Sequence, residues 1–190
     1  MKQLTRLLVI AMVLALSTAN AFALPIVYEV NNLAGDRWEY RYDVTNDPAN
    51  TFAIEEFTVY FDLGLYDTLQ VGNTPTGWDA LVVQPDSGFP PGPGLGDGFY
   101  DALAVAVPGI APGDSVGGFS VQFTYLGTGT PGAQFYEIVD PETFEPLQSG
   151  ATTTAVPEPG SLLLLVAGLL ILIGTRSRVA WRRELCADTR

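Results

Sequence analysis

The middle of the chain alternates apolar and polar residues with the two-residue period of a β-strand. Over residues 38–44, Trp38, Tyr40, Tyr42 and Val44 alternate with charged side chains, which predicts a strand with one face in a core and one in solvent. The same alternation recurs at 57–61 and 119–125. Strand-forming composition marks four further segments: 26–30, 78–83, 99–107 and 134–139.

Turn-forming residues separate these seven segments, and no long segment shows helical periodicity. Asn46-Asp47-Pro48 and Pro112-Gly113-Asp114-Ser115 are two such turns. Seven short strands predict an all-β fold over 24–145, a two-sheet antiparallel sandwich of immunoglobulin- or fibronectin-like type. The Pro/Gly-rich segment 90–98 is expected to form an exposed loop. Residues 146–156 are expected to form a flexible stalk.

The N-terminal segment combines a basic start, a short apolar run and small residues. Lys2 and Arg6 precede the apolar residues 7–16, and Ala21 and Ala23 follow. A run of ten residues is about half of the ~20 that a membrane-spanning helix needs. Residues 1–23 are therefore predicted to be a secretory signal peptide, cut by signal peptidase between Ala23 and Leu24.

The C-terminal segment holds a second apolar run with a basic end. Residues 161–175 are predicted to form a single transmembrane helix, although ~1.5 Å per residue gives only about 22 Å of helix. The arginines that follow should resist translocation and keep the tail, 179–190, in the cytoplasm. These predicted membrane-stop residues are Arg176, Arg178, Arg182 and Arg183.

The residues before this helix carry a family resemblance. The sequence Val156-Pro157-Glu158-Pro159, followed by the apolar helix and the arginines, resembles the PEP-CTERM sorting signal of Gram-negative bacteria over about 156–183. The resemblance implies recognition by exosortase and processing near residues 157–159. It also implies an inner-membrane-anchored intermediate, then release or attachment at the cell surface, often in bacteria that make exopolysaccharide and form biofilm.

Charge is distributed unevenly along the chain. The formal net charge is −12, but both ends are basic, and residues 24–156 hold two arginines against eighteen acids, a net −16. Such a body is a poor nucleic-acid binder because phosphate contacts need clustered Lys and Arg. The chain has no histidine and one cysteine, Cys186. This excludes a Ser-His-Asp triad, a histidine-ligated zinc site and an internal disulfide.

The residues of the exported body bear on three functions. Catalysis has little support, because the adjacent pair Glu55 and Glu56 should point to opposite faces of a strand. Calcium could bind the loop acids Asp97, Asp101 and Asp114, but a solvated acidic surface is the simpler interpretation. A glycan could stack on an exposed tryptophan, for which Trp78 is the candidate. The sequence predicts a non-enzymatic surface or matrix protein with a structural or adhesive role, without a cofactor. A glycan- or calcium-binding module is the alternative.

Overall fold

The computed structural model describes residues 25–88 and 96–154, which form ten β-strands. The strands are β1 (Ile26–Ala34), β2 (Arg37–Thr45), β3 (Glu56–Phe61), β4 (Tyr66–Val71), β5 (Trp78–Val83), β6 (Gly98–Ala104), β7 (Ser115–Tyr125), β8 (Phe135–Val139), β9 (Pro146–Ala151) and β10 (Thr153–Thr154). Each of the seven predicted segments coincides with a strand, to within a few residues at its ends. The predicted all-β class is confirmed.

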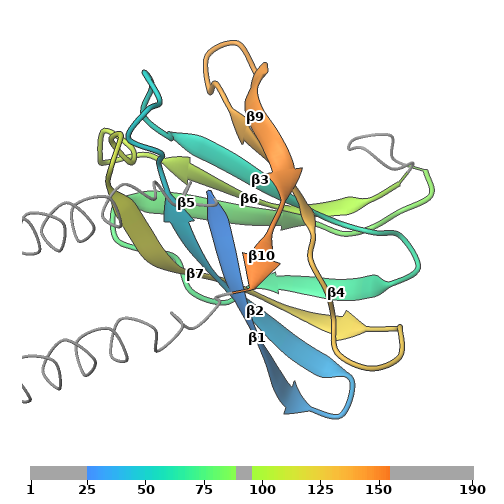
Figure 1. Cartoon of the computed structure of the whole chain (residues 1–190). Coiled ribbons are helices and arrows are strands. Elements are labelled where there is room, and N and C mark those ends of the chain that lie inside the picture. Colours follow the sequence, from blue (N-terminus) through green and yellow to red (C-terminus); the bar gives the residue numbers. More distant parts are fainter. Residues whose placement is uncertain (1–24, 89–95, 155–190) are drawn as a thin grey trace, which may run out of the picture. The chain divides into compact units, whose positions relative to one another are not determined.

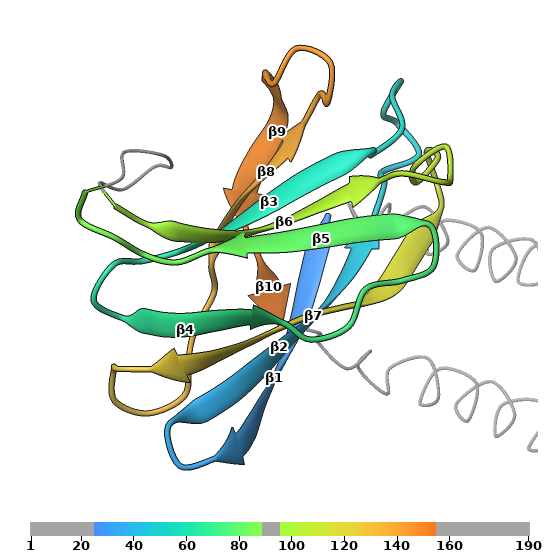
Figure 2. The same cartoon turned by 180° about the vertical axis from the view of Figure 1, so that it is seen from behind.

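Two five-stranded sheets pack face to face, as predicted for a sandwich. The first has the order β10-β1-β2-β7-β4 and the second the order β5-β6-β3-β8-β9. Figure 2 shows β3, β6 and β5 in one layer and β4, β7, β2 and β1 in the other. All strand pairs of the described residues are antiparallel except β1 with β10, which is parallel.

The core between the sheets is rich in aromatic rings. Tyr40 stacks on Phe123 with ring centroids 4.8 Å apart, and Phe57 meets Phe119 edge-to-face at 4.9 Å. These four side chains are fully buried. The prediction that the aromatic face of the strand at 38–44 lies in the core is therefore confirmed for Tyr40 and Tyr42, while Trp38 is half-buried at its margin.

The buried hydroxyls of Tyr40 and Tyr42 in this core are hydrogen-bonded, whereas the buried Tyr100 hydroxyl has no partner among the described residues. Tyr40 Oη donates to the Gly132 carbonyl at 2.7 Å, and the Gln134 side-chain amide donates to Tyr40 Oη at 2.5 Å. Burying a hydroxyl without a hydrogen-bond partner costs up to several kcal/mol, and Gln134 avoids this penalty for Tyr40 by supplying a partner. The segment before β8 thereby links the two sheets.

Strand β4 has no counterpart among the predicted segments. Its pairing with β7 shifts between Asp67 and Gln70, and Thr68 has a φ of 52°. This irregularity places Tyr66 and Leu69, three positions apart, on the buried side. A bulge therefore removes the two-residue period on which the sequence analysis relied.

The predicted flexible stalk at 146–156 is wrong for residues 146–154. Residues 146–151 form β9 on the edge of the second sheet, and β10 pairs with β1, Val27 opposite Thr153. Between them, Thr152 is 1% exposed, and its Oγ1 accepts a hydrogen bond from the backbone amide of Gln134 at 2.9 Å. Small polar residues can form an edge strand when a neighbouring strand pairs with their backbone groups. The composition of this segment therefore did not distinguish a strand from a flexible stalk. Figure 1 shows β9 and β10 in orange, following each other along the body.

The chain divides into two compact units, 1–155 and 156–190, and the strands all belong to the first. Four predicted segments lie wholly or mostly outside the described residues: the signal peptide at 1–23, the transmembrane helix at 161–175, the tail at 179–190 and the loop at 90–98. Within residues 25–88 and 96–154, no helix is long and apolar enough to cross a membrane.

Candidate functional site

Trp78 is not the exposed stacking platform that the sequence suggested. It opens β5 with 8% of its surface exposed, and its ring packs edge-to-face on Phe119 at 5.1 Å and tilted on Phe57 at 6.2 Å. The neighbouring Thr76-Gly77 turn directs it inward. Trp78 is therefore a core residue rather than an exposed platform.

The three calcium candidates lie in separate environments. Asp97 is 8% exposed, and its Oδ1 accepts a hydrogen bond from the Leu63 amide at 3.1 Å. Asp101 lies within β6, and Asp114 is an exposed turn residue whose carbonyl accepts from the Asn46 amide. Among the residues described, no three acids are close enough together to hold a metal ion. The structure assigns Asp97 a role in fixing a loop.

A row of aromatic side chains crosses the side of the second sheet that faces away from the core. We call this side the outer face. Phe99 of β6, Tyr60 of β3 and Phe135 of β8 form the aromatic row, with ring centroids 6.3 Å apart for Phe99–Tyr60 and 5.9 Å for Tyr60–Phe135. None of the three belongs to the core cluster. Three adjacent strands thus present one continuous aromatic strip.

A row of polar side chains runs beside the aromatic row on the same three strands, two residues away along each strand. Thr58 of β3 stands between Asp101 of β6 and Glu137 of β8 in register, and these three residues form the polar row. Thr58 Oγ1 donates to Asp101 Oδ1 at 2.7 Å, and Tyr60 Oη donates to Glu137 Oε2 at 2.7 Å. The second bond ties the two rows together and fixes the Glu137 carboxylate beside the rings.

Two carboxyl groups of this face, those of Asp101 and Glu56, are harder to ionise than usual. Burial raises the pKa of Asp101, partly offset by hydrogen bonds from Thr58 and Glu56. Burial, then the charge of Asp101, raises the pKa of Glu56. The pKa of the Tyr60 hydroxyl is also raised, first by burial and then by its bond to Glu137, so it stays a donor. The outer face therefore combines apolar rings with oriented oxygen acceptors.

The positive charges of the body lie on the other sheet. Arg37 and Arg41 both belong to β2, and Arg41 Nε bonds Glu39 Oε2 at 2.8 Å. Every charged residue on the outer face is an acid: Asp79, Glu56, Asp101 and Glu137. The two sides of the sandwich thus differ in chemistry.

The aromatic row was missed by sequence reasoning, although a signal for it exists. Phe99-Tyr100 and Phe135-Tyr136 are consecutive aromatic pairs within strands. Because neighbouring strand residues point to opposite faces, only one ring of each pair can enter the core. Tyr100 and Tyr136 do so, which leaves Phe99 and Phe135 outside.

Beyond the sandwich, residues 155–183 match the family model of the PEP-CTERM protein-sorting motif. The chain carries a PEP-CTERM sorting signal. The resemblance found at Val156, Pro157, Glu158 and Pro159 is thereby confirmed, and the motif indicates an exported protein processed by exosortase. No curated protein and no solved structure matches the chain, so the immunoglobulin- or fibronectin-like type stays a prediction.

The residues predicted to act in sorting lie outside the part of the chain that the structure describes. These are the signal cleavage residues Ala21, Ala23 and Leu24, the motif residues 156–159 and the membrane-stop arginines. The body begins next to the first of these sites: the Pro25 carbonyl accepts from the Thr45 amide at 2.8 Å, and Ile26 is fully buried. Residue 25 therefore already belongs to the fold.

Proposed function

We propose that this protein is a non-enzymatic, adhesive or structural component of the bacterial cell surface or extracellular matrix. In this proposal, signal peptidase removes residues 1–23 and exosortase processes the chain near Pro157-Glu158-Pro159. The chain passes through an inner-membrane-anchored intermediate, and the acidic sandwich then reaches the outside. The observation that carries the proposal is the sorting motif at 155–183, which begins directly after the last strand of the sandwich, β10.

A structural or adhesive role fits what the body offers. The body has few of the side chains that enzymes use as bases or nucleophiles: residues 24–156 contain no histidine, no cysteine and no lysine. A sandwich of ten strands with an aromatic outer face is suited to display rather than to turnover, for which converging acid, base or nucleophilic groups are needed. Exopolysaccharide in the matrix is the proposed surrounding.

Expression in a host that has exosortase tests this function. The full chain is compared with a chain lacking residues 157–190 and with Glu158→Ala in the sorting motif. We expect the full chain to be found at the surface in a form shortened at its C-terminus, and its N-terminus to begin at Leu24. Deletion of the host exosortase should leave the full chain in the inner membrane.

Two results would contradict the proposal. One is identical size and location of the full chain with and without exosortase. The other is an N-terminus that still begins at Met1 in exported protein. The truncated chain serves as the control for export itself, because it keeps residues 1–23 and lacks only the sorting signal.

A further inference from the structure

We infer that the outer face of the β5-β6-β3-β8-β9 sheet is a binding surface for a neutral polysaccharide. Sugar rings would stack on the aromatic row, and sugar hydroxyls would donate to the carboxylates of the polar row. The inference gives the proposed adhesive role a site and a ligand class. It rests on the proposed function in one respect: the protein must reach the outside of the cell to meet this ligand.

The aromatic row supplies the stacking surface. Phe135 is 36% exposed, and Tyr60 and Phe99 are half-buried, so each ring is held on one side and open on the other. The interplanar angles are 58° for Tyr60–Phe99 and 40° for Tyr60–Phe135, so the strip turns with the twist of the sheet. A pyranose ring exposes C–H groups on its faces, and such groups pack on aromatic rings. An extended, twisting polymer suits three rings in a row better than a compact molecule does.

The polar row supplies directional acceptors at the edge of that strip. Glu137 uses Oε2 to hold Tyr60 Oη, and Asp101 uses Oδ1 to hold Thr58 Oγ1. The bonds orient both carboxylates; Asp101 is held by Glu56 as well as by Thr58, and Glu137 has its second oxygen left, among the described residues, to accept from a ligand. Fixed acceptors beside an apolar platform are what recognition of a sugar requires, since its hydroxyls lie at the ring edge and its C–H groups on the faces.

The charge of the face selects against other occupants. A second copy that docked through the same outer face would bury these carboxylates against a surface with no basic side chain, and desolvated charges without partners are costly. An acidic polysaccharide, a phosphate polymer or an anionic lipid would meet four acids: Asp79, Glu56, Asp101 and Glu137. Neutral hydroxyl donors have neither cost. The chemistry therefore points to a polymer without carboxylate, sulfate or phosphate groups.

Affinity gel electrophoresis of the body, residues 24–156, tests the site. This fragment contains the whole core cluster, Ile26 to Ile138, and so can be studied without the sorting signal. The probes are gels that contain hydroxyethylcellulose, glucomannan or dextran, with carboxymethylcellulose as the anionic counterpart of the first. We expect retardation in at least one neutral gel, and less in carboxymethylcellulose than in hydroxyethylcellulose.

Matched variants separate the site from the rest of the surface. Phe135→Ala should weaken retardation about tenfold, as expected when a stacking ring is truncated. Phe135→Leu, which keeps an apolar side chain in β8 but lacks the ring, should lose as much and covers the case in which the alanine variant misfolds. Phe144→Ala is the control: Phe144 is 75% exposed in the β8–β9 turn, away from the aromatic row, and its removal should change nothing.

Several outcomes would overturn the site. They are the absence of retardation in all three neutral gels, equal losses in the Phe135 and Phe144 variants, or stronger retardation by carboxymethylcellulose. A concentration-dependent dimer in sedimentation that Phe135→Leu dissolves would assign the face to a second copy instead. None of these results bears on export, which is measured in the host, so the two proposals fail independently.

Discussion

Replacing Trp78 by alanine is expected to destabilise the sandwich strongly. Trp78 has 92% of its surface buried, 8% being exposed, and contacts Phe57 and Phe119. An aromatic side chain of this size buries roughly 150–250 Å², and ~25 cal/mol per Å² gives about 4–6 kcal/mol for the whole ring. The alanine methyl retains part of this, and β5 is an edge strand that can relax, so we expect a loss of about 3–4 kcal/mol.

Urea unfolding followed by far-ultraviolet circular dichroism measures this loss. Circular dichroism is preferred because Trp78 is itself one of the two tryptophans of the body. With a denaturant slope of ~1–3 kcal/mol per M, the midpoint should fall by about 2 M, and the slope should stay unchanged. Such a loss is a large fraction of the ~5–15 kcal/mol that stabilises a domain of this size.

Trp38→Ala is the matched control. Trp38 is half-buried at the margin of the core, so its replacement should cost clearly less than that of Trp78. If Trp78→Ala costs less than about 1 kcal/mol, or no more than Trp38→Ala, the packing argument is refuted, because values that small are typical of surface positions. The polysaccharide affinity gel should also distinguish Trp78 as a core residue from Trp78 as a stacking platform: if Trp78 is a core residue, a folded Trp78→Ala variant should still be retarded.

Three further changes test the outer face, the last strands and a strained turn. Glu56→Gln should stabilise the body at pH 7 by about 0.5 kcal/mol, since burial disfavours the charged carboxylate and the charge of Asp101 on the paired strand repels it. Thermal melting should show the gain vanish below pH 4. The sign follows from the raised pKa of Glu56 and of Asp101: the folded state holds its protons more tightly than the unfolded state, so ionisation destabilises the fold as pH rises. A gain that persists in acid would contradict this. Thr152→Val should cost about 1–3 kcal/mol in urea unfolding, because the amide of Gln134 loses its acceptor; no loss would mean that the segment behaves as the stalk first expected. Phe144, with φ at 58°, occupies a conformation that costs an L-residue ~1–2 kcal/mol. Phe144→Gly should therefore raise the melting temperature while Phe144→Ala does not, and equal effects would argue against backbone strain.

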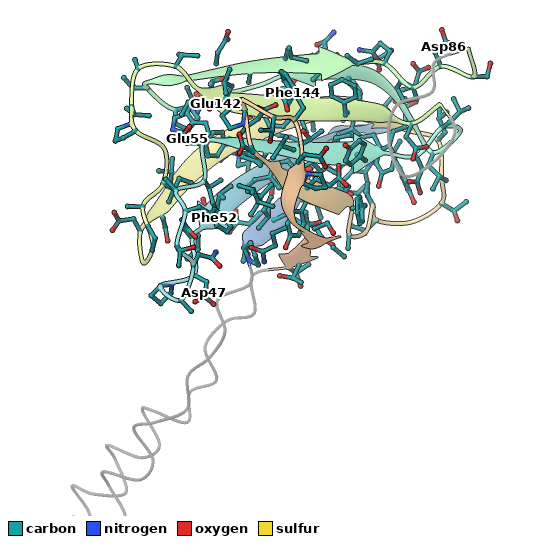
Figure 3. All side chains as sticks on the ribbon, turned by 90° about the horizontal axis from the view of Figure 1, so that it is seen from above. Asp47, Phe52, Glu55, Asp86, Glu142 and Phe144 are labelled. Carbon is teal, nitrogen blue, oxygen red and sulfur yellow. The ribbon has the colours of Figure 1, made fainter. Side chains whose placement is uncertain are left out.

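Figure 3 shows Phe144 on the body, seen from above. Phe144 and Glu142 stand on the β8–β9 turn, with Glu55 on the same side of the view and Asp86 at the opposite end. Asp140 organises this turn, since its Oδ1 accepts from the Glu142 amide at 2.9 Å and from the Thr143 amide at 3.2 Å. The side-chain cap holds the turn while Phe144 takes the left-handed conformation that glycine adopts more easily.

The strands that the sequence predicted are those in which burial follows a regular alternation. In β2 and β7 the buried apolar side chains occupy every second position, so the amino-acid pattern and the backbone pattern agree. Strand β4 breaks this agreement at Thr68, and β9 and β10 are built from small polar residues whose place is decided by backbone pairing. A single sequence records side-chain burial directly, whereas backbone pairing at an edge leaves little trace in it.

The aromatic row of the candidate site shows a second limit of reading burial from the sequence. Aromatic residues were assigned to the core because a charged face lay opposite them, and for Tyr40 and Tyr42 that reasoning holds. It fails for strands with apolar residues on both faces, where the pattern cannot say which ring enters the core. Only the second sheet, with Tyr100 and Tyr136 turned inward, decides that Phe99 and Phe135 stay outside.

The missing stalk changes how the fold relates to its processing sites. The last paired residue, Thr154, stands opposite Tyr28 in β1, so the chain enters and leaves the body at one edge of the first sheet. Only two residues separate Thr154 from Pro157, and an extended chain covers ~3.3–3.6 Å per residue, which allows about 10 Å between them. A sorting motif of this reach cannot be presented on a long tether. The pairing of β10 with β1 therefore continues to within two residues of Pro157, where the sequence had predicted a flexible stalk.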